Sequence, residues 1–379
     1  MTIPMLPGQL RENQRFLVKP QGLEQIAKAV PNEFQLIGPV REKWAINLAP
    51  FENIDELAFG CKVSEHQASY RLEDDPGNPD LSAARVMNSP KSFNFRPKET
   101  LYQTRNENGG SAYETPRLAV DKKAFFGIHA CDVASLYVLD RTFSRRYPDP
   151  AYAARRQDTI VIGINCFEPG ANCFCSTFET GPGLTGGFDI GLSWISNKWL
   201  VEVATETGVR LMNGVDKEPA LPEVVKLKEK KIRTARSGMS KAFDLKKGLR
   251  ALNENYDHPY WEEPAERCLS CANCINVCPT CFCYRMTDES TLDRTVTTRT
   301  RQWDACQNEQ FASVHGGNFR PERVDRIRQW VNHKINWTIE QYGVSGCVGC
   351  GRCVTWCPTA IDITEPVWRL GGKDIGFTA

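Results

Sequence analysis

Two cysteine runs with the same internal spacing constrain the fold of this chain more than any other feature. Each run places three cysteines two residues apart and a fourth cysteine three residues further on, directly before a proline. The first run is CLSCANCINVCP at residues 268–279, and the second is CVGCGRCVTWCP at residues 347–358. The chain has sixteen cysteines in 379 residues, and most lie at such short spacings. This pattern is more typical of reduced, metal-binding thiolates than of a disulfide framework.

The spacing of the two runs predicts a pair of [4Fe–4S] clusters. In the ferredoxin arrangement C-x2-C-x2-C-x3-C-P, the three closely spaced cysteines bind one cluster and the fourth binds the neighbouring cluster. Two copies in one chain complete this exchange. We therefore assign one cluster to Cys268, Cys271, Cys274 and Cys357, and the other to Cys347, Cys350, Cys353 and Cys278. Structural zinc, the main alternative, usually takes two pairs of ligands and often includes histidine, and neither run contains a histidine.

Four further cysteines follow predicted strands in an α/β region. The first comes after the apolar stretch 124–128 and before a predicted helix that Asp132 could cap. The second ends the β-branched run 159–165, and the other two lie in the loop that follows it. Because open α/β sheets gather their sites at the C-terminal ends of strands, this placement favours a third cluster over buried, inert cysteines. Its predicted ligands are Cys131, Cys166, Cys173 and Cys175.

Some candidate features carry a plainer interpretation. Four cysteines remain after this assignment, and we interpret them as packing beside a cluster, although a fourth site is an alternative; they are Cys61, Cys281, Cys283 and Cys306. His129 could hydrogen-bond near the third cluster, and a core or surface role is the alternative. The segment GPGLTG at 181–186 satisfies G-x-G-x-x-G, but it does not link a strand to a helix, so it predicts a loop beside that cluster.

The order of predicted elements indicates two domains. A strand, a helix and a strand between residues 124 and 166 predict a βαβ unit, and therefore an α/β domain over residues 1–250. A hairpin is expected at 188–208 and surface helices at 222–253. Residues 251–379 should form an α-helical two-cluster ferredoxin domain, because apolar residues at 324–339 keep helical spacing. Helices between the cysteine runs resemble the ferredoxin domains of succinate dehydrogenase-type iron–sulfur subunits.

Composition excludes several classes of partner and location. The formal net charge is +1, so no basic field favours nucleic acid. No stretch of roughly eighteen apolar residues occurs, and the first sixteen residues lack the charged and apolar regions of a signal peptide. We therefore expect no nucleic-acid partner, no membrane span and a cytoplasmic location.

Three segments, in order, are similar to one family of iron–sulfur subunits. They are FFGIHACDVASLYVLDRTF, YAARRQDTIVIGINCFEPGANCFCSTF, and the region from CLSCANCINVCPTCFC to CVGCGRCVTWCP. They resemble the β subunit of sulfhydrogenases, which are cytoplasmic [NiFe] hydrogenases with sulfur-reductase activity, and the iron–sulfur subunit of anaerobic sulfite reductase. The resemblance implies an additional iron–sulfur centre on the N-terminal cysteines. It also implies two partners: a flavin/NAD(P)-binding reductase subunit, and a hydrogenase or sirohaem sulfite reductase catalytic subunit.

We predict an iron–sulfur electron-transfer subunit of a multi-subunit oxidoreductase. It would relay single electrons between the flavin/NAD(P)-binding subunit and the catalytic subunit of a cytoplasmic [NiFe] hydrogenase or sulfhydrogenase. The iron–sulfur subunit of an anaerobic, dissimilatory-type sulfite reductase is the alternative, and a subunit of a heterodisulfide-reductase-like complex is a further one. A zinc-stabilised scaffold and an autonomous catalyst are the other classes considered. Ligation of each cluster by four cysteines disfavours the autonomous catalyst, because no iron is left open, and no catalytic residue is predicted.

Overall fold

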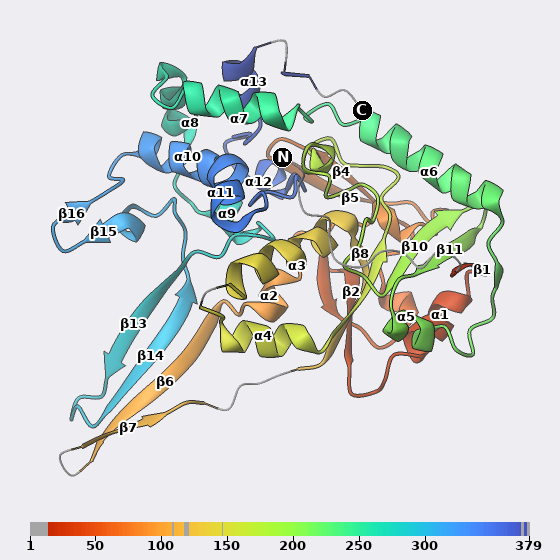
Figure 1. The fold of residues 1–379 in the computed structure, drawn as a ribbon, viewed down its shortest axis with the longest axis horizontal. Coiled ribbons are helices and arrows are strands. Elements are labelled where there is room, and N and C mark those ends of the chain that lie inside the picture. Colours follow the sequence, from red (N-terminus) through yellow and green to blue (C-terminus); the bar gives the residue numbers. More distant parts are fainter. Residues whose placement is uncertain (1–13, 108–109, 117–120, 146, 373–374, 377–379) are drawn as a thin grey trace.

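A mixed eight-stranded sheet forms the centre of the larger part of the molecule (Figure 1). The computed structural model describes residues 14–107, 110–116, 121–145, 147–372 and 375–376. Within these residues the strand order is β12-β1-β11-β10-β9-β8-β2-β3, in which β10, β9, β8 and β2 are parallel and the outer pairs are antiparallel. The strands are β1 (Arg15–Val18), β2 (Gln35–Arg41), β3 (Ile46–Pro50), β8 (Lys123–His129), β9 (Thr159–Ile164), β10 (Ile190–Ile195), β11 (Lys198–Val203) and β12 (Glu218–Pro219).

The predicted βαβ unit is confirmed. β8 and β9 pair in parallel, with Phe125 opposite Val161, and helix α3 (Ala130–Phe143) begins directly after β8. All seven residues of β8 are buried, as are the last five of β9. Such continuous apolar strands are typical of the centre of a parallel sheet covered on both faces. The C-terminal ends of both strands lie at the same edge, where the predicted third group of cysteines begins.

The predicted hairpin and surface helices are also confirmed. β10 and β11 turn at Ser196 and Asn197, which both have positive φ, as the primed turns of two-residue hairpins require. The charged segment at 222–253 forms α6 (Pro222–Ser237) and α7 (Leu245–Glu254).

A four-stranded antiparallel sheet projects from the body of the molecule (Figure 1). Its order is β13-β14-β6-β7, with bounds β6 (Lys98–Glu107), β7 (Gly110–Glu114), β13 (Tyr284–Ser290) and β14 (Val296–Trp303). β13 and β14 come from the segment between the cysteine runs, whereas β6 and β7 come from the N-terminal third of the chain. The sheet therefore joins both sides of the expected boundary at residue 250, and the division into two domains stays a prediction.

The segment between the cysteine runs is helical in its second half. α10 (Arg323–Asn332), a π-helical segment (His333–Trp337) and α11 (Thr338–Tyr342) follow one another without a break. Ile327, Trp330, Val331 and Ile335 are buried on one face, as the apolar spacing predicts. The first half of the segment holds the β13–β14 hairpin, so this part of the chain is mixed rather than wholly helical.

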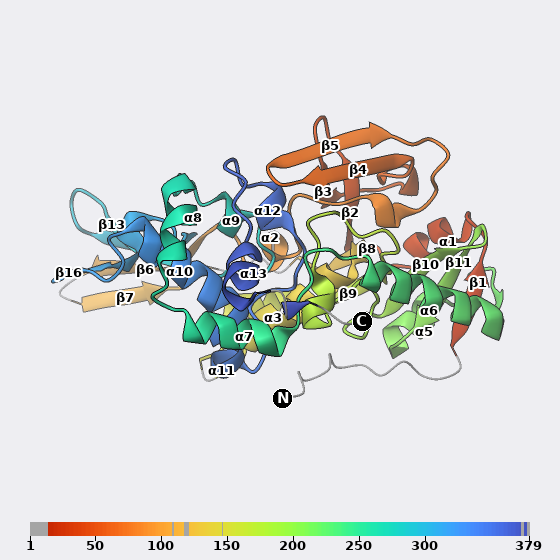
Figure 2. The ribbon, with the colours of Figure 1, turned by 90° about the horizontal axis from the view of Figure 1, so that it is seen from above.

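The remaining elements are short and surround the two sheets. The hairpin of β4 (Cys61–His66) and β5 (Ser69–Asp74) lies against α12, as Figure 2 shows from above. The others are β15 (Ser313–Val314), β16 (Gly317–Asn318), α1 (Gly22–Lys28), α2 (Lys91–Asn94), α4 (Pro150–Gln157), α5 (Glu206–Leu211), α8 (Glu262–Arg267), α9 (Asn273–Asn276), α12 (Arg352–Thr355) and α13 (Glu365–Gly371). In the described ranges, no helix has the length and apolar character that a bilayer span requires.

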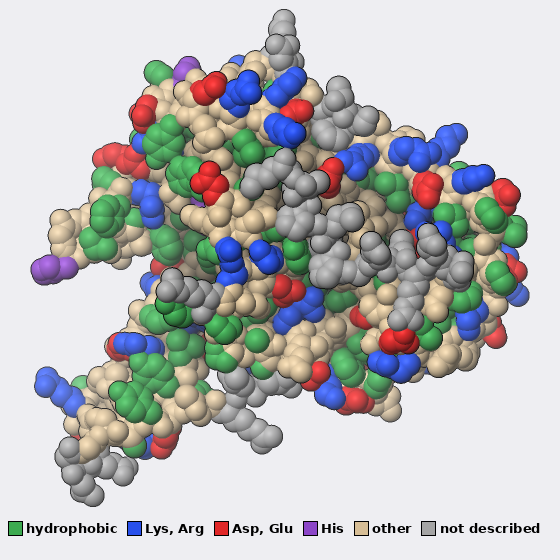
Figure 3. All heavy atoms as spheres, viewed as in Figure 1, with side chains coloured by type: hydrophobic (Ala, Val, Ile, Leu, Met, Phe, Trp, Pro, Cys, Tyr) green, Lys and Arg blue, Asp and Glu red, His purple; other side chains and the backbone are tan. Residues whose placement is uncertain are grey.

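Two main cores lie side by side. One packs around the eight-stranded sheet, and the other surrounds the cysteine runs with apolar residues from α7, α8, α10, α13 and the loop at 174–178. Both cysteine runs and the loop 173–175 belong to this second core. On the face seen in Figure 3, acidic and basic side chains are interspersed, in keeping with the small net charge.

Candidate metal centres

The two cysteine runs adopt the same backbone conformation. In each run the residues two and four positions after the first cysteine have left-handed φ: Ser270 (54°) and Ala272 (64°) in the first run, and Gly349 (60°) and Gly351 (77°) in the second. A short helix follows each loop, α9 after the first and α12 after the second. Left-handed residues tighten a loop, so each run wraps its first three cysteines around one point.

The fourth cysteine of each run lies with the other run. A small cavity is lined by Cys268, Cys271 and Cys274 of the first run together with Cys357 of the second. Burial raises the pKa of Cys353 well above its ordinary value, and Cys347, Cys350 and Cys278 raise it further, which places Cys278 beside the second run. These two groups of four are the groups that the spacing predicts. That they ligate metal stays a prediction.

Hydrogen-bond donors face the sulfur atoms of both runs. The backbone N–H of Ser270 donates to Cys268 Sγ at 3.4 Å, and that of Gly349 donates to Cys347 Sγ at 3.3 Å. Ile361 N–H donates to Cys357 Sγ at 3.3 Å. Such donors stabilise the thiolate form, and hydrogen bonds to sulfur are one means by which proteins adjust iron–sulfur centres. The donor sets therefore fit [4Fe–4S] clusters.

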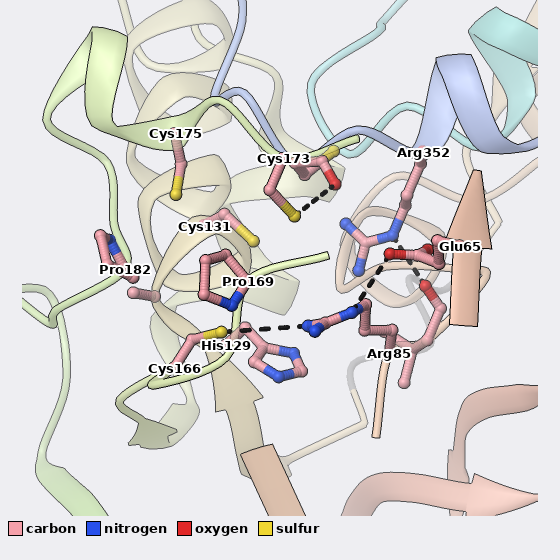
Figure 4. Close-up of a pocket in the computed structure, with 13 residues that line it drawn as sticks. Glu65, Arg85, His129, Cys131, Cys166, Pro169, Cys173, Cys175, Pro182 and Arg352 are labelled. Atoms are coloured by element: carbon pink, nitrogen blue, oxygen red, sulfur yellow. Dashed lines mark hydrogen bonds and ion pairs between the residues drawn. The ribbon is translucent and has the colours of Figure 1, made fainter. Parts of the chain in front are cut away.

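The third group of cysteines converges on one cavity at the edge of the large sheet. Its volume is about 40 Å³, and Figure 4 shows the labelled sulfur atoms around it. Cys131 lies in the first turn of α3, Cys166 follows β9, and the other two come from the loop at 173–175. The structure thus brings together the four residues predicted from strand ends: Cys131, Cys166, Cys173 and Cys175.

The expected role of Asp132 as a helix cap is wrong. His129 occupies the N-cap position of α3, and Asp132 lies inside the first turn. The Asp132 carboxylate instead accepts two hydrogen bonds from the Arg352 guanidinium, both at 2.8 Å. Because Arg352 belongs to the second cysteine run, this buried ion pair ties that run to the helix that carries Cys131.

Buried charges surround the third group. Burial raises the pKa of Cys173 to about 12, although the nearby Arg85 guanidinium acts in the opposite direction. Arg85 Nη1 lies 3.9 Å from Cys166 Sγ, and Arg85 Nε lies 3.2 Å from Glu65 Oε2. Burial also lowers the pKa of His129 to about 4, and its Nε2 is hydrogen-bonded to Ser82 O at 2.9 Å. His129 is therefore a neutral core residue beside the cavity.

The third group is in direct contact with the second cysteine run. Phe174 N–H donates to Gly349 O at 2.8 Å, and Cys350 also lines the third cavity. A Cβ at Gly349 would lie 2.5 Å from the backbone of Phe174 and Cys175, so glycine permits this close approach. The three groups consequently form a row, in which the second run lies between the third group and the group that includes Cys357.

The four leftover cysteines do not gather at one place. Cys61 packs in the core of the large sheet, where it accepts a hydrogen bond from Arg41 Nη1 at 3.7 Å. Cys281, Cys283 and Cys306 instead pack in the core around the cysteine runs. Within the described ranges, no three His, Cys, Asp or Glu side chains are arranged closely enough to hold a single metal ion.

Sequence reasoning missed the buried cations of the sites. Arg352 could have been noticed, since it is the charged residue inside an otherwise small and apolar run. Arg85, Lys91 and Lys334 lie in segments without a cysteine motif, and nothing in their local pattern distinguishes them from surface residues.

Comparison with known proteins agrees with this geometry. Residues 267–361 match the family model of a 4Fe-4S dicluster domain. Sulfhydrogenase 2 subunit beta of Pyrococcus furiosus is 32% identical over 320 residues, which cover 82% of this chain and 92% of that protein. No solved structure matches. The chain carries a 4Fe-4S dicluster domain and belongs to the family of sulfhydrogenase β subunits, as the resemblance of its sequence predicts.

Proposed function

We propose that this chain is the iron–sulfur electron-transfer subunit of a sulfhydrogenase-like complex and that twelve cysteines hold three [4Fe–4S] clusters. The observation that carries the proposal is the row of three four-cysteine groups, in which the second run contacts the third group through Gly349 and exchanges its fourth cysteine with the first run. Each group supplies four thiolates, which is the ligand set that such clusters require.

The protein's own residues would hold the clusters, exclude water and set their spacing. A [4Fe–4S] cluster, when bound, takes up and releases one electron. Phe174, Phe178 and Trp330 pack in the core that encloses the cysteines. Of the twelve predicted ligands, all of which the structure describes, Cys271 alone is exposed, and the neighbouring Leu269 is 64% exposed. The Cys271 end of the row is therefore the end through which electrons would enter or leave.

The partners that we infer are a flavin/NAD(P)-binding reductase subunit and a hydrogenase catalytic subunit. The name of the Pyrococcus furiosus relative supports a hydrogenase partner. No observation on this chain favours the sulfite reductase or heterodisulfide-reductase-like alternatives over it.

The proposal can be tested by anaerobic purification of the tagged chain from its native host. We expect a hydrogenase catalytic subunit and a flavin-containing subunit to copurify, and dithionite should reduce the complex to give the broad low-temperature EPR signals of interacting clusters. Copurification with a sirohaem protein would replace the hydrogenase assignment. A purified chain without any iron-based EPR signal would reject electron transfer as its function.

A further inference from the structure

Lys334 places a buried ammonium group where the two cysteine runs meet. Its side chain is 4% exposed, and Nζ donates to Thr280 Oγ1 at 2.7 Å. Thr280 Oγ1 in turn donates to Gly346 O at 2.6 Å and lies 3.3 Å from Cys278 Sγ. Cys278 is the cysteine that crosses to the second run, and Gly346 directly precedes Cys347. The ammonium group therefore faces the predicted cluster of Cys278, Cys347, Cys350 and Cys353.

No carboxylate neutralises this charge in the part of the chain that the structure describes, since none lies within 4.0 Å of Lys334 Nζ. Lys228, another buried lysine, is bonded by both carboxylate oxygens of Glu202, at 2.8 and 2.9 Å. A buried charge without an opposite charge is strongly unfavourable. Burial by itself lowers the pKa of Lys334, but the thiolates of Cys278, Cys281 and Cys347 outweigh it and raise that pKa. The compensating negative charge is thus the sulfur of the cluster site.

The backbone around Lys334 departs from a regular helix. Lys334 lies in the π-helical segment His333–Trp337 between α10 and α11, and Ile335 and Asn336 are buried beside it. π-helical turns are rare and occur frequently at functional sites. Lys334 O also accepts a hydrogen bond from Ser345 Oγ at 3.3 Å, which fixes this turn against the start of the second run.

The other two groups face no comparable charge. At the third group, Arg85 is paired with Glu65 and Arg352 with Asp132. At the group that includes Cys357, Arg267 is paired with Glu365 at 3.3 Å. Lys91 is buried near Cys278, but its Nζ is held by Ile275 O and Asn276 O, and burial lowers its pKa. Lys334 is the buried ammonium whose charge the sulfur atoms sustain.

We propose that Lys334 is a positioning residue that raises the reduction potential of the cluster bound by Cys278, Cys347, Cys350 and Cys353, and so makes this cluster the most easily reduced of the three. The proposal rests on the proposed function. Reduction adds one electron, supplied by the redox partner, and makes the cluster more negative by one charge. A fixed positive charge at short range in a buried site stabilises that reduced form more than the oxidised form.

The test is an EPR-monitored redox titration of the anaerobically purified chain and of its Lys334→Met variant. Methionine keeps the length and apolar stem of lysine but removes the charge. One reduction step should move to a more negative potential in Lys334→Met and return close to its original value in Lys334→Arg. The step that moves should be the one that a Cys347→Ser variant alters. Lys228→Met, which removes a buried lysine already paired with Glu202, should leave all steps in place.

An unchanged set of potentials in Lys334→Met, with the iron content of the original protein, would overturn the proposal. If Lys334→Met loses iron, Lys334→Gln replaces it, because the amide can still donate to Thr280 while carrying no charge. The same negative shift is then required, and its absence overturns the proposal equally. Failure of the proposed function would look different, since the unsubstituted chain itself would then show no reducible cluster.

Discussion

Single buried residues connect the cysteine groups, and the Arg352–Asp132 ion pair is the clearest case. Both side chains are buried, and Arg352 Nε also donates to Val86 O at 2.9 Å. Removing one partner of a buried pair leaves the other charge uncompensated, at a cost of about 3–5 kcal/mol. We therefore expect Asp132→Asn to lower the free energy of unfolding by roughly that amount, measured by urea denaturation. Asp288→Asn, which breaks an exposed pair with Arg299, is the control and should change stability little. Equal effects in the two variants would contradict this role.

Gly349 provides a second prediction at the residue scale. Its φ is +60°, and a Cβ there would lie 2.5 Å from the backbone of the loop that carries Cys173 and Cys175. Gly349→Ala should force the second run and this loop apart, destabilise the protein by about 1–3 kcal/mol and lower its iron content. Gly214→Ala isolates the backbone term, because Gly214 also has positive φ but has no atom within 4 Å of the position that a Cβ would take. The iron content of Gly214→Ala should be unaffected, and an equal loss in both variants would refute the packing explanation.

At the scale of elements, the four-stranded sheet depends on a buried ion cluster as well as on its strand ladder. Arg301 of β14 contacts Glu99 of β6 at 2.8 Å and also Asp149, and Arg155 contacts Glu99 as well. Burial tends to raise the pKa of Glu99, but its hydrogen bonds with Arg155 and Arg301 outweigh this and lower it. A lowered folded-state pKa means that the stabilisation is present above the unfolded pKa of about 4.3 and is lost as pH falls through the folded value.

The corresponding measurement is the pH dependence of stability in the original chain and in Glu99→Gln. Stability of the original chain should fall more steeply below about pH 4 than that of Glu99→Gln, because the variant has no carboxylate to protonate. The difference between the two curves removes the contribution of acid-labile clusters, which both proteins share. Parallel curves would show that Glu99 does not contribute through its charge.

Which elements the sequence could predict follows from the range of the interactions that form them. β8 and β9 were predictable because their buried, continuous apolar runs are local signals, and the twin loops were predictable because ligand spacing is local as well. The sheet of β6 and β14 was not, since its partners are far apart in sequence, with Gln103 and Thr298 separated by 195 positions. Lys334 was also unpredictable, because a basic residue in an amphipathic helix normally faces solvent.

At the scale of the whole molecule, two cores share one set of cysteine sites. The third group stands at the C-terminal ends of β8 and β9, and the other two groups lie in the core built from the C-terminal part of the chain. The contacts of Gly349, Gly351 and Arg352 hold the two cores together. A chain of this form places three metal sites in a row, and this is the arrangement that electron transfer between two other subunits requires.

The iron and acid-labile sulfide content of the anaerobically purified chain, with zinc measured in the same sample, tests this account most directly. Three [4Fe–4S] clusters predict about twelve irons and about twelve sulfides per chain, and a Cys166→Ala variant should lose about four of each. About eight irons would contradict the third cluster. A colourless protein that contains zinc and no iron would contradict the account as a whole.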